Sequence, residues 1–206
     1  RAKDIEEKNG FTSFTVEFYG ASQRVTVPTV GIHNVYDALA AFAVGYEMRM
    51  EPRKIAAGLK SFVPSGMRQR IKKVGGITVI EDCYNASPDS QKAALDVLSS
   101  FKSNRRIAVL GDMLELGKYS DVSHENVGKY TENKNIDILF TYGAKAKHIA
   151  EGAKGFVDEI KSFDDKTELT KALLETLNDG DAVLFKASRG MKLEDVINSL
   201  YREWEE

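Results

Sequence analysis

A basic segment near the end of the chain is the best candidate in this sequence for binding an anion. Lys186, Ser188 and Arg189 lie within four residues, directly before a helical pattern that starts at Met191. A helix N-terminus, an ammonium and a guanidinium reinforce one another around a carboxylate or phosphate. We therefore expect these three side chains to contact an anionic ligand. The alternative is a basic turn that faces water.

A second polar segment combines a carboxylate, an aromatic ring and an amide. Asp82, Tyr84 and Asn85 follow a short apolar run at 77–81. The carboxylate can accept hydrogen bonds from ribose hydroxyls and the ring can stack on a base. Asp and Asn are also ordinary turn formers, so the residue types alone support either interpretation.

A third candidate group follows the apolar run at 106–110. Asp112 and Glu115 are suited to binding a substrate ammonium or helping to hold a metal, although most carboxylates are simply solvated. His124 follows in a helical pattern. A hydrogen-bonded structural role for this histidine competes with a role in catalysis.

The elements that must position these residues are strands alternating with helices from Arg68 onward. We predict strands at 70–74, 77–81, 106–110, 137–141, 159–163 and 182–185, and helices at 88–101, 121–132, 144–153, 166–177 and 191–204. This order predicts an α/β fold with a doubly wound, mainly parallel, Rossmann-like sheet. Ligands of such sheets bind at the carboxyl ends of the strands, and all three polar segments lie there.

The first part of the chain has a different pattern. Runs at 11–18 and 23–27 predict a β-hairpin, and two helices follow, one with Asn34 as its N-cap and one opening at Pro52. The helical pattern stops near Val63-Pro64. We therefore predict two domains, residues 1–63 and 64–206. Because the chain starts without Met and runs straight into a strand, we expect its first domain to be incomplete.

Composition excludes several classes of protein. The net charge is −2 with both signs interspersed, which argues against binding to nucleic acid or to a membrane surface. The longest near-apolar stretch, 38–46, is far too short to cross a bilayer. Cys83 is the single cysteine, which favours a reducing, cytoplasmic location. Neither G-x-x-x-x-G-K-[ST] nor G-x-G-x-x-G occurs, so the chain shows no phosphate loop or dinucleotide fingerprint of its own.

Four segments together resemble the Mur ligases. They are G-I-H-N-V-Y-D-A-L-A-A at 31–41, D-C-Y-N-A-S-P at 82–88, I-A-V-L-G-D-M-L-E-L-G at 107–117 and K-A-S-R-G-M at 186–191. Their order and spacing are most similar to the MurF type, the UDP-N-acetylmuramoyl-tripeptide:D-alanyl-D-alanine ligases. The resemblance runs from about Val16 to the end of the chain.

The resemblance implies a three-domain parent enzyme. Residues 1–63 would be the last part of its central ATPase domain, and residues 64–206 its whole C-terminal domain. The parent would use ATP and Mg²⁺, both held mainly by residues upstream, to activate the tripeptide carboxylate of UDP-N-acetylmuramoyl-tripeptide as an acyl phosphate. D-alanyl-D-alanine would then attack. The chain alone would be an inactive monomer without catalytic or metal-binding residues of its own.

The resemblance also assigns residues to ligands. The ATP group is His33, Asn34, Asp37, Arg68, Asp82, Tyr84 and Asn85. The substrate group is Asp112, Glu115, His124, Lys186, Ser188 and Arg189. Two positions depart from the family pattern: Asp37 replaces a second Asn, and an ionised carboxylate only accepts hydrogen bonds. Ala187 replaces a Gly, which restricts positive φ.

Three other interpretations remain. Two are related ligases, of the MurE type or similar to folylpolyglutamate synthase. A D-N-P-R type motif or a different C-terminal loop would favour them, and the sequence contains neither. The third is a non-catalytic module that binds a nucleotide or a peptide. A G-K-[ST] loop encoded upstream would distinguish a ligase from such a module.

Overall fold

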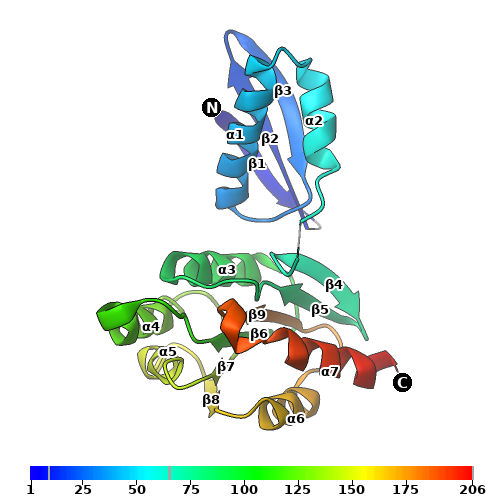
Figure 1. Cartoon of the computed structure of the whole chain (residues 1–206). Helices are drawn as coiled ribbons and strands as arrows, with labels where there is room; N and C mark the ends of the chain where they lie inside the picture. The colour runs from blue at the N-terminus through cyan, green and yellow to red at the C-terminus, as the bar shows by residue number, and fades with distance from the viewer. Residues whose placement is uncertain (9, 65, 206) are drawn as a thin grey trace. The chain divides into compact units, whose positions relative to one another are not determined.

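The computed structural model describes residues 1–8, 10–64 and 66–205 of the chain. These form two compact units, unit 1 (Arg1–Ser65) and unit 2 (Gly66–Glu206), shown in Figure 1. The division falls two residues after the domain boundary predicted between residues 63 and 64.

Unit 1 contains a three-stranded antiparallel sheet of β1 (Ala2–Lys8), β2 (Phe11–Phe18) and β3 (Ala21–Val27), paired in that order. The predicted hairpin is β2–β3, and its two turn residues, Tyr19 and Gly20, both have positive φ, as a tight hairpin turn requires. The sequence did not predict β1. Its side chains are mostly charged and exposed, so this edge strand has no apolar alternation to reveal it.

Two helices complete unit 1, α1 (Ile32–Glu47) and α2 (Pro52–Lys60). The prediction that Asn34 caps α1 is wrong, because α1 begins at Ile32 after Gly31, whose φ of 109° turns the chain. The Asn34 side chain lies inside the first turn and donates a hydrogen bond to the Val30 carbonyl. Val35 and Phe42 of α1 and Ile55 of α2 pack with strand residues such as Phe14 and Val25.

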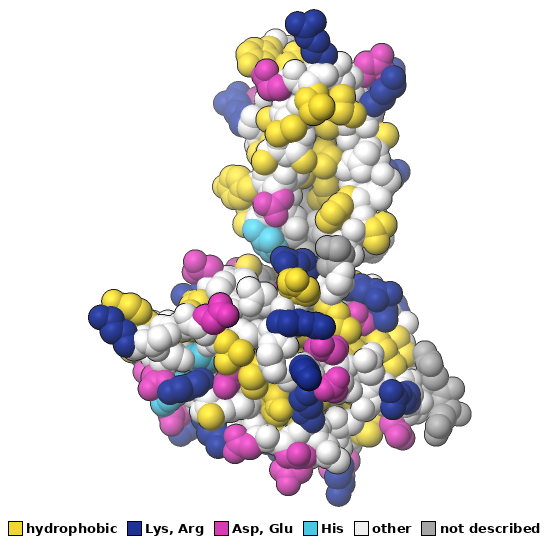
Figure 2. Space-filling model, in the orientation of Figure 1, with side chains coloured by type: hydrophobic (Ala, Val, Ile, Leu, Met, Phe, Trp, Pro, Cys, Tyr) yellow, Lys and Arg dark blue, Asp and Glu magenta, His cyan; other side chains and the backbone are white. Residues whose placement is uncertain are grey.

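A second face of α1 is also apolar but uncovered within unit 1. Ile32, Tyr36, Val44 and Met48 repeat at multiples of four residues, and Tyr36 and Met48 are 66% and 72% exposed. Hydrophobic side chains are correspondingly visible on the surface of this unit in Figure 2. Unit 1 therefore has a core on one side of α1 and exposed apolar residues on the other.

Unit 2 contains a six-stranded sheet with strand order β4-β5-β9-β6-β7-β8. Its strands are β4 (Arg70–Val74), β5 (Ile77–Glu81), β6 (Arg106–Gly111), β7 (Ile138–Tyr142), β8 (Glu159–Phe163) and β9 (Ala182–Lys186). Only β4 is antiparallel to its neighbour. The predicted mainly parallel α/β fold is confirmed.

Helices cover both faces of this sheet (Figure 1). On one face lie α3 (Pro88–Ser100), α4 (Ser120–Lys129) and α5 (Lys147–Gly152), and on the other α6 (Lys166–Thr176) and α7 (Glu194–Glu205). Leu169 and Leu173 of α6 and Leu193 and Ile197 beside and in α7 share one core with alternate strand residues. Strand residues on both faces are buried, as a doubly wound sheet requires.

Two glycines allow α4 and α5 to cross with their backbones in contact. A Cβ atom on Gly128 would lie 2.1 Å from the Ile149 carbonyl oxygen, and one on Gly152 would lie 2.2 Å from the Glu125 carbonyl oxygen. Any side chain at either position would push the helices apart.

A buried carboxylate joins α7 to the β4–β5 hairpin. Glu81 is 1% exposed, and its carboxylate accepts a 2.6 Å hydrogen bond from the Tyr201 hydroxyl and pairs with Lys72 at 3.0 Å. Burial, together with this hydrogen bond, raises the pKa of Tyr201. The hydroxyl therefore stays a donor to Glu81.

In the part of the chain that the structure describes, no helix is both long and apolar enough to cross a membrane.

Candidate ligand site at the carboxyl edge of the unit 2 sheet

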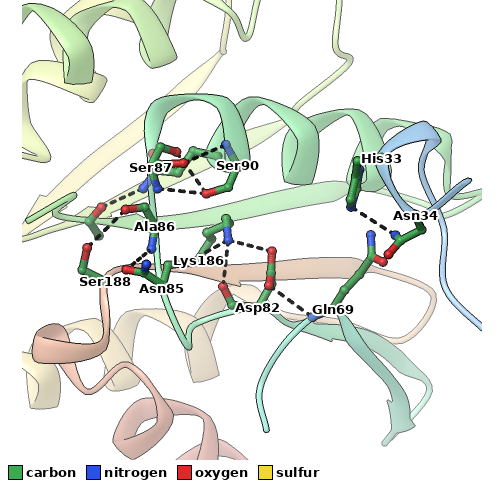
Figure 3. A network of polar contacts seen from close by, with 12 residues as sticks. His33, Asn34, Gln69, Asp82, Asn85, Ala86, Ser87, Ser90, Lys186 and Ser188 are labelled. Atoms are coloured by element: carbon green, nitrogen blue, oxygen red, sulfur yellow. Dashed lines mark hydrogen bonds and ion pairs between the residues drawn. The ribbon is translucent and has the colours of Figure 1, made fainter. Parts of the chain in front are cut away.

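The polar segments predicted from the sequence meet at one edge of unit 2. The loop after β5 lies beside the end of β9, since the Asp82 N–H donates to the Phe185 carbonyl. The loop after β6 joins them, because the Ser188 N–H donates to the Asp112 carbonyl at 3.1 Å. Figure 3 shows the first two segments. The short 3₁₀ helix Arg189–Met191 and α7 continue from β9.

Lys186 lies inside this edge, not on its surface. It is 3% exposed, and its ammonium pairs with the Asp82 carboxylate at 2.8 Å. It also donates to the carbonyl oxygens of Asp82 at 3.3 Å and Asn85 at 2.9 Å (Figure 3). The other Asp82 carboxylate oxygen accepts from the Gln69 N–H. Lys186 and Asp82 therefore form an internal ion pair that holds the loop after β5.

Ser188 is buried as well and joins two loops. Its hydroxyl oxygen accepts from the Leu114 N–H at 2.9 Å and lies 3.5 Å from the Ala86 carbonyl, to which it donates. Since a hydroxyl has one donor and two acceptor positions, little of its capacity is left for a ligand.

Asp112 stabilises the loop after β7. Its carboxylate accepts backbone hydrogen bonds from Lys145 at 3.0 Å and Ala146 at 2.6 Å, and only 8% of the residue is exposed. Gly143 has a φ of 112° and faces this carboxylate, where a Cβ atom would lie 2.5 Å from an Asp112 oxygen. These bonds shape the turn before α5, which explains why α5 begins at Lys147 and not at the predicted residue 144.

His124 is fully buried on α4. Its Nε2 accepts from the Met113 N–H at 2.9 Å, and its Nδ1 donates to the Ser120 carbonyl at 2.7 Å. Burial lowers the pKa of His124, so this imidazole is held in its neutral form. Both ring nitrogens therefore have hydrogen-bond partners, and His124 anchors the loop after β6 to α4 through the Met113 N–H.

The side chains that do reach the surface of this edge form an aromatic and cationic cluster. Tyr84 is 42% exposed, and the guanidinium carbon of Arg68 lies 4.3 Å from its ring centre. The guanidinium carbon of Arg189 lies 5.9 Å from the same ring. An exposed ring beside two guanidinium groups is suited to a ligand with a planar group and negative charge. We call Arg68, Tyr84 and Arg189 the Tyr84 cluster.

Glu194 is a residue of this site that the sequence did not single out. Its carboxylate pairs with Arg189 at 2.7 Å and its side chain is 15% exposed, against 60% for that of Arg189. The only signal in the sequence is an acidic residue in the first turn of α7, which is common in helices. Glu194 orients the guanidinium of Arg189 while leaving most of that side chain accessible.

Asn85 and Glu115 are exposed at the tips of their loops. The Asn85 side-chain oxygen accepts from the Ala86 N–H, as in an Asx turn. Glu115 has a φ of 66°, so its backbone lies in the left-handed region. Both side chains are accessible to a ligand.

Ala187 fits its position without positive φ. Its methyl group instead restricts Gly111 of β6, where a Cβ atom would lie 2.7 Å from the Ala187 Cβ. The departure from the family pattern at this position is therefore accommodated between the two strands.

The three remaining predicted residues, His33, Asn34 and Asp37, lie in unit 1 near the start of α1. His33 and Asp37 are exposed, and the Asn34 amide donates to His33 Nε2 at 3.1 Å. These three residues share the first turns of one helix.

The exposed groups at this edge of unit 2 are suited to a nucleotide. The Tyr84 cluster offers a ring and two cations. Asp82, whose side chain is 20% exposed, lies two residues before Tyr84 in the sequence. Among the described residues of either unit, no three His, Cys, Asp or Glu side chains gather as metal ligands would.

A comparison with family models matches residues 67–189 to the glutamate ligase domain of the Mur ligases. The UDP-N-acetylmuramoyl-tripeptide–D-alanyl-D-alanine ligase of Bacillus subtilis is 40% identical over 202 residues, covering 96% of this chain and 44% of that protein. The enzyme of the same name from Haemophilus influenzae is 35% identical and is also covered to 44%.

Solved structures give the same result. MurF from Acinetobacter baumannii superposes with a TM-score of 0.87 and 27% identity over 98% of this chain and 44% of that chain. MurF ligase from Thermotoga maritima in complex with ADP gives 0.84 and 25%, covering 99% and 46%. This chain thus spans less than half the length of each of these proteins.

Proposed function

The chain belongs to the Mur ligase family, and on that premise we propose that it is part of an ATP-dependent ligase of the MurF type. The whole protein would join D-alanyl-D-alanine to UDP-N-acetylmuramoyl-tripeptide in the synthesis of peptidoglycan precursors. The relatives bearing that enzyme name support this proposal. The observation that carries it is the Tyr84 cluster, an exposed ring beside two guanidinium groups, on loops that buried polar residues hold in place.

In this reaction ATP would supply the phosphoryl group that activates the tripeptide carboxylate as an acyl phosphate. The dipeptide amine then attacks the acyl carbon, an amide forms, and phosphate leaves. The part played by unit 2 would be positioning and charge stabilisation. Tyr84 stacks on a planar group, Arg68 pairs with phosphate, and Arg189, oriented by Glu194, pairs with the carboxylate of the dipeptide.

The buried residues would act indirectly. Lys186, Ser188, Asp112 and His124 keep the loops in place, because the side chain of each makes hydrogen bonds within the protein. The sequence predicted that these residues contact the substrate. Their burial favours a supporting role, which leaves direct contact to Arg189 and Glu115.

We also propose that residues 1–63 belong to the ATPase domain of the whole protein and residues 64–206 to its C-terminal domain. His33, Asn34 and Asp37 would then lie near the nucleotide. Phosphate loop and Mg²⁺ ligands would come from other parts of the protein, so this chain alone should form no amide. The buried free thiol of Cys83 supports a reducing, cytoplasmic location, and we expect a monomer.

Calorimetric titration of D-alanyl-D-alanine and of ADP into this chain tests the proposal, with Arg189→Ala and Arg202→Ala as a matched pair. Arg202 is exposed on α7, away from the Tyr84 ring contacts, and serves as the control. We expect Arg189→Ala to weaken binding of the dipeptide at least tenfold, since a charge-assisted pair contributes about 1.5–3 kcal/mol. Arg202→Ala should bind as the unchanged chain does.

Equal binding by both variants would contradict the assignment of Arg189. Binding of a diamino acid or of glutamate in place of the dipeptide would favour a MurE-type or folylpolyglutamate-type ligase. Binding of ADP alone, together with a natural gene that encodes no G-K-[ST] loop upstream, would favour a non-catalytic nucleotide-binding module.

A further inference from the structure

The segment Met67–Gln69, where the chain enters unit 2, is docked on the loop after β5. The Tyr84 N–H donates to the Met67 carbonyl at 3.2 Å, and the Gln69 N–H donates to an Asp82 carboxylate oxygen at 3.1 Å. The sulfur atoms of Met67 and Cys83 are 3.3 Å apart. Arg68, between these contacts, is thereby placed over the Tyr84 ring.

Asp82 links this segment to the interior. One of its carboxylate oxygens accepts from Gln69 and the other pairs with the Lys186 ammonium at 2.8 Å. The ammonium has three N–H groups and meets three acceptors, the Asp82 carboxylate and the carbonyls of Asp82 and Asn85. Its hydrogen-bonding capacity is therefore filled within the protein.

Lys186 is also fixed in space. It is the last residue of β9, a strand hydrogen-bonded on both sides by β5 and β6, and it is 3% exposed. To bind a substrate carboxylate, this ammonium would have to leave its three acceptors. The Asp82 carboxylate would then remain without its cationic partner. Breaking a buried ion pair in this way is strongly unfavourable.

We propose that Lys186 is a positioning residue that acts through Asp82. It holds the Asp82 carboxylate in the orientation that docks Met67–Gln69, and this docking sets Arg68 over Tyr84. For the ligand that Arg68 and Tyr84 meet, the inference rests on the proposed function; the docking itself does not depend on any ligand.

Cys83 provides the measurement. It is the single cysteine, it is fully buried, and burial raises its pKa to about 12. Because its sulfur lies against Met67, undocking of the segment exposes it to reagent. We expect Lys186→Met to accelerate alkylation of Cys83 by N-ethylmaleimide by about tenfold or more, because local opening of the segment would cost less free energy. Hydrogen exchange of the Gln69 and Tyr84 backbone amides should also be faster in Lys186→Met.

A second signal reports on Arg68 itself. The ring resonances of Tyr84 in an NMR spectrum depend on the guanidinium above the ring. In Lys186→Met they should shift toward their positions in Arg68→Ala. General loosening of the fold would not produce that specific shift.

Two controls separate this effect from loss of charge and of stability. Arg189→Met also removes one cation near Tyr84 and should leave the alkylation rate unchanged. Leu173→Ala removes a fully buried side chain of α6 that belongs to the same core as Cys83, and it lowers the stability of unit 2. When the two variants are compared at equal free energy of unfolding, Cys83 should be alkylated more slowly in Leu173→Ala than in Lys186→Met.

The neutral pair Asp82→Asn with Lys186→Met guards against misfolding of the single variant. It should alkylate as fast as Lys186→Met, because the two side chains act as one unit. Wild-type alkylation in Lys186→Met, or in the double variant if the single variant does not fold, would overturn the proposal. So would equal acceleration by Leu173→Ala. No ligand is added, so a failed dipeptide titration would count against the proposed function alone.

Discussion

The two units solve the same packing problem to different extents. Unit 2 covers both faces of its sheet with helices, so strand residues such as Leu139 and Phe140 are fully buried on opposite faces. Unit 1 packs α1 and α2 on its sheet and leaves Tyr36 and Val44 of α1, and Met48 directly after it, exposed. Most of the exposed large hydrophobic side chains among the described residues lie in unit 1, although it is the smaller unit.

The difference shows that completeness of a core and quality of a helix are separate properties. α1 is a regular helix of 16 residues with apolar residues on two faces, which is the pattern of a helix buried on both sides. Within unit 1 only one of these faces has a partner. Unit 2, by contrast, has the two-sided burial expected of a self-sufficient doubly wound domain.

The largest expected effect sets the cores against each other. Phe140→Ala in β7 should lower the free energy of unfolding of unit 2 by about 3–5 kcal/mol, because it leaves a cavity at a fully buried site. Trp204 is the single tryptophan and packs on the same core, so its fluorescence during urea unfolding reports on unit 2. Phe42→Ala in unit 1 should leave that midpoint unchanged. A shifted midpoint would mean that the units unfold together.

A pair of glycine substitutions sharpens the comparison. Gly128→Ala should destabilise unit 2 by about 1–3 kcal/mol, because its Cβ would overlap the Ile149 carbonyl of α5. Gly58→Ala on exposed α2 meets nothing within 4 Å and should stabilise unit 1 by about 0.5–1 kcal/mol. Amide exchange, read separately in each unit, measures both. Equal signs for the two substitutions would contradict the packing difference.

His124 should make unit 2 sensitive to acid. Burial lowers its folded-state pKa, so the unfolded chain binds a proton more readily and stability is lost as pH falls below 6.5 toward the folded-state value. His124→Gln should lower stability at pH 7.5 by about 1 kcal/mol through its lost hydrogen bonds. It should also reduce the loss between pH 7 and pH 5, measured by Trp204 fluorescence in urea. An unchanged slope would place the titrating group elsewhere.

The smallest effect concerns the uncovered face of α1. Val44→Ser replaces a 62% exposed residue and should change the stability of unit 1 by less than about 0.5 kcal/mol, while it lowers binding of an apolar dye. Val35→Ser on the same helix is the matched control, because Val35 is 1% exposed and its loss should cost several times more. Similar costs would show that the Val44 face is covered.

The central strands β5, β6, β7 and β9 could be predicted because each is a short, largely apolar run. The predicted bounds of β4, β5 and β8 agree with the structure. β1 escaped prediction because Ala2–Lys8 is stabilised by pairing with β2 and not by apolar burial. The start of α1 was misjudged because the conformation of Gly31, and not the side chain of Asn34, begins the helix.

The candidate site was predicted from the rule that ligands meet the carboxyl ends of parallel strands, but the sequence could not separate its buried residues from its exposed ones. Lys186 and Arg189 are both cations of one short segment, yet one is buried against Asp82 and the other is largely exposed. Residue type predicts the capacity to bind an anion. Whether the cation pairs with a carboxylate inside the protein or remains accessible to a ligand depends on its burial. Burial is set by the whole fold and not by the local sequence.

The crossing of α4 and α5 has a consequence for how this protein tolerates change. His124 lies on α4 one turn before Gly128. The contact between the two helix backbones therefore also fixes the position from which the imidazole accepts the Met113 N–H. A side chain at Gly128 or Gly152 would lift α4 and, with it, the support of the loop that carries Glu115. A substitution in the outer helical layer would therefore alter the loop after β6 at the candidate ligand site, although it lies outside that site.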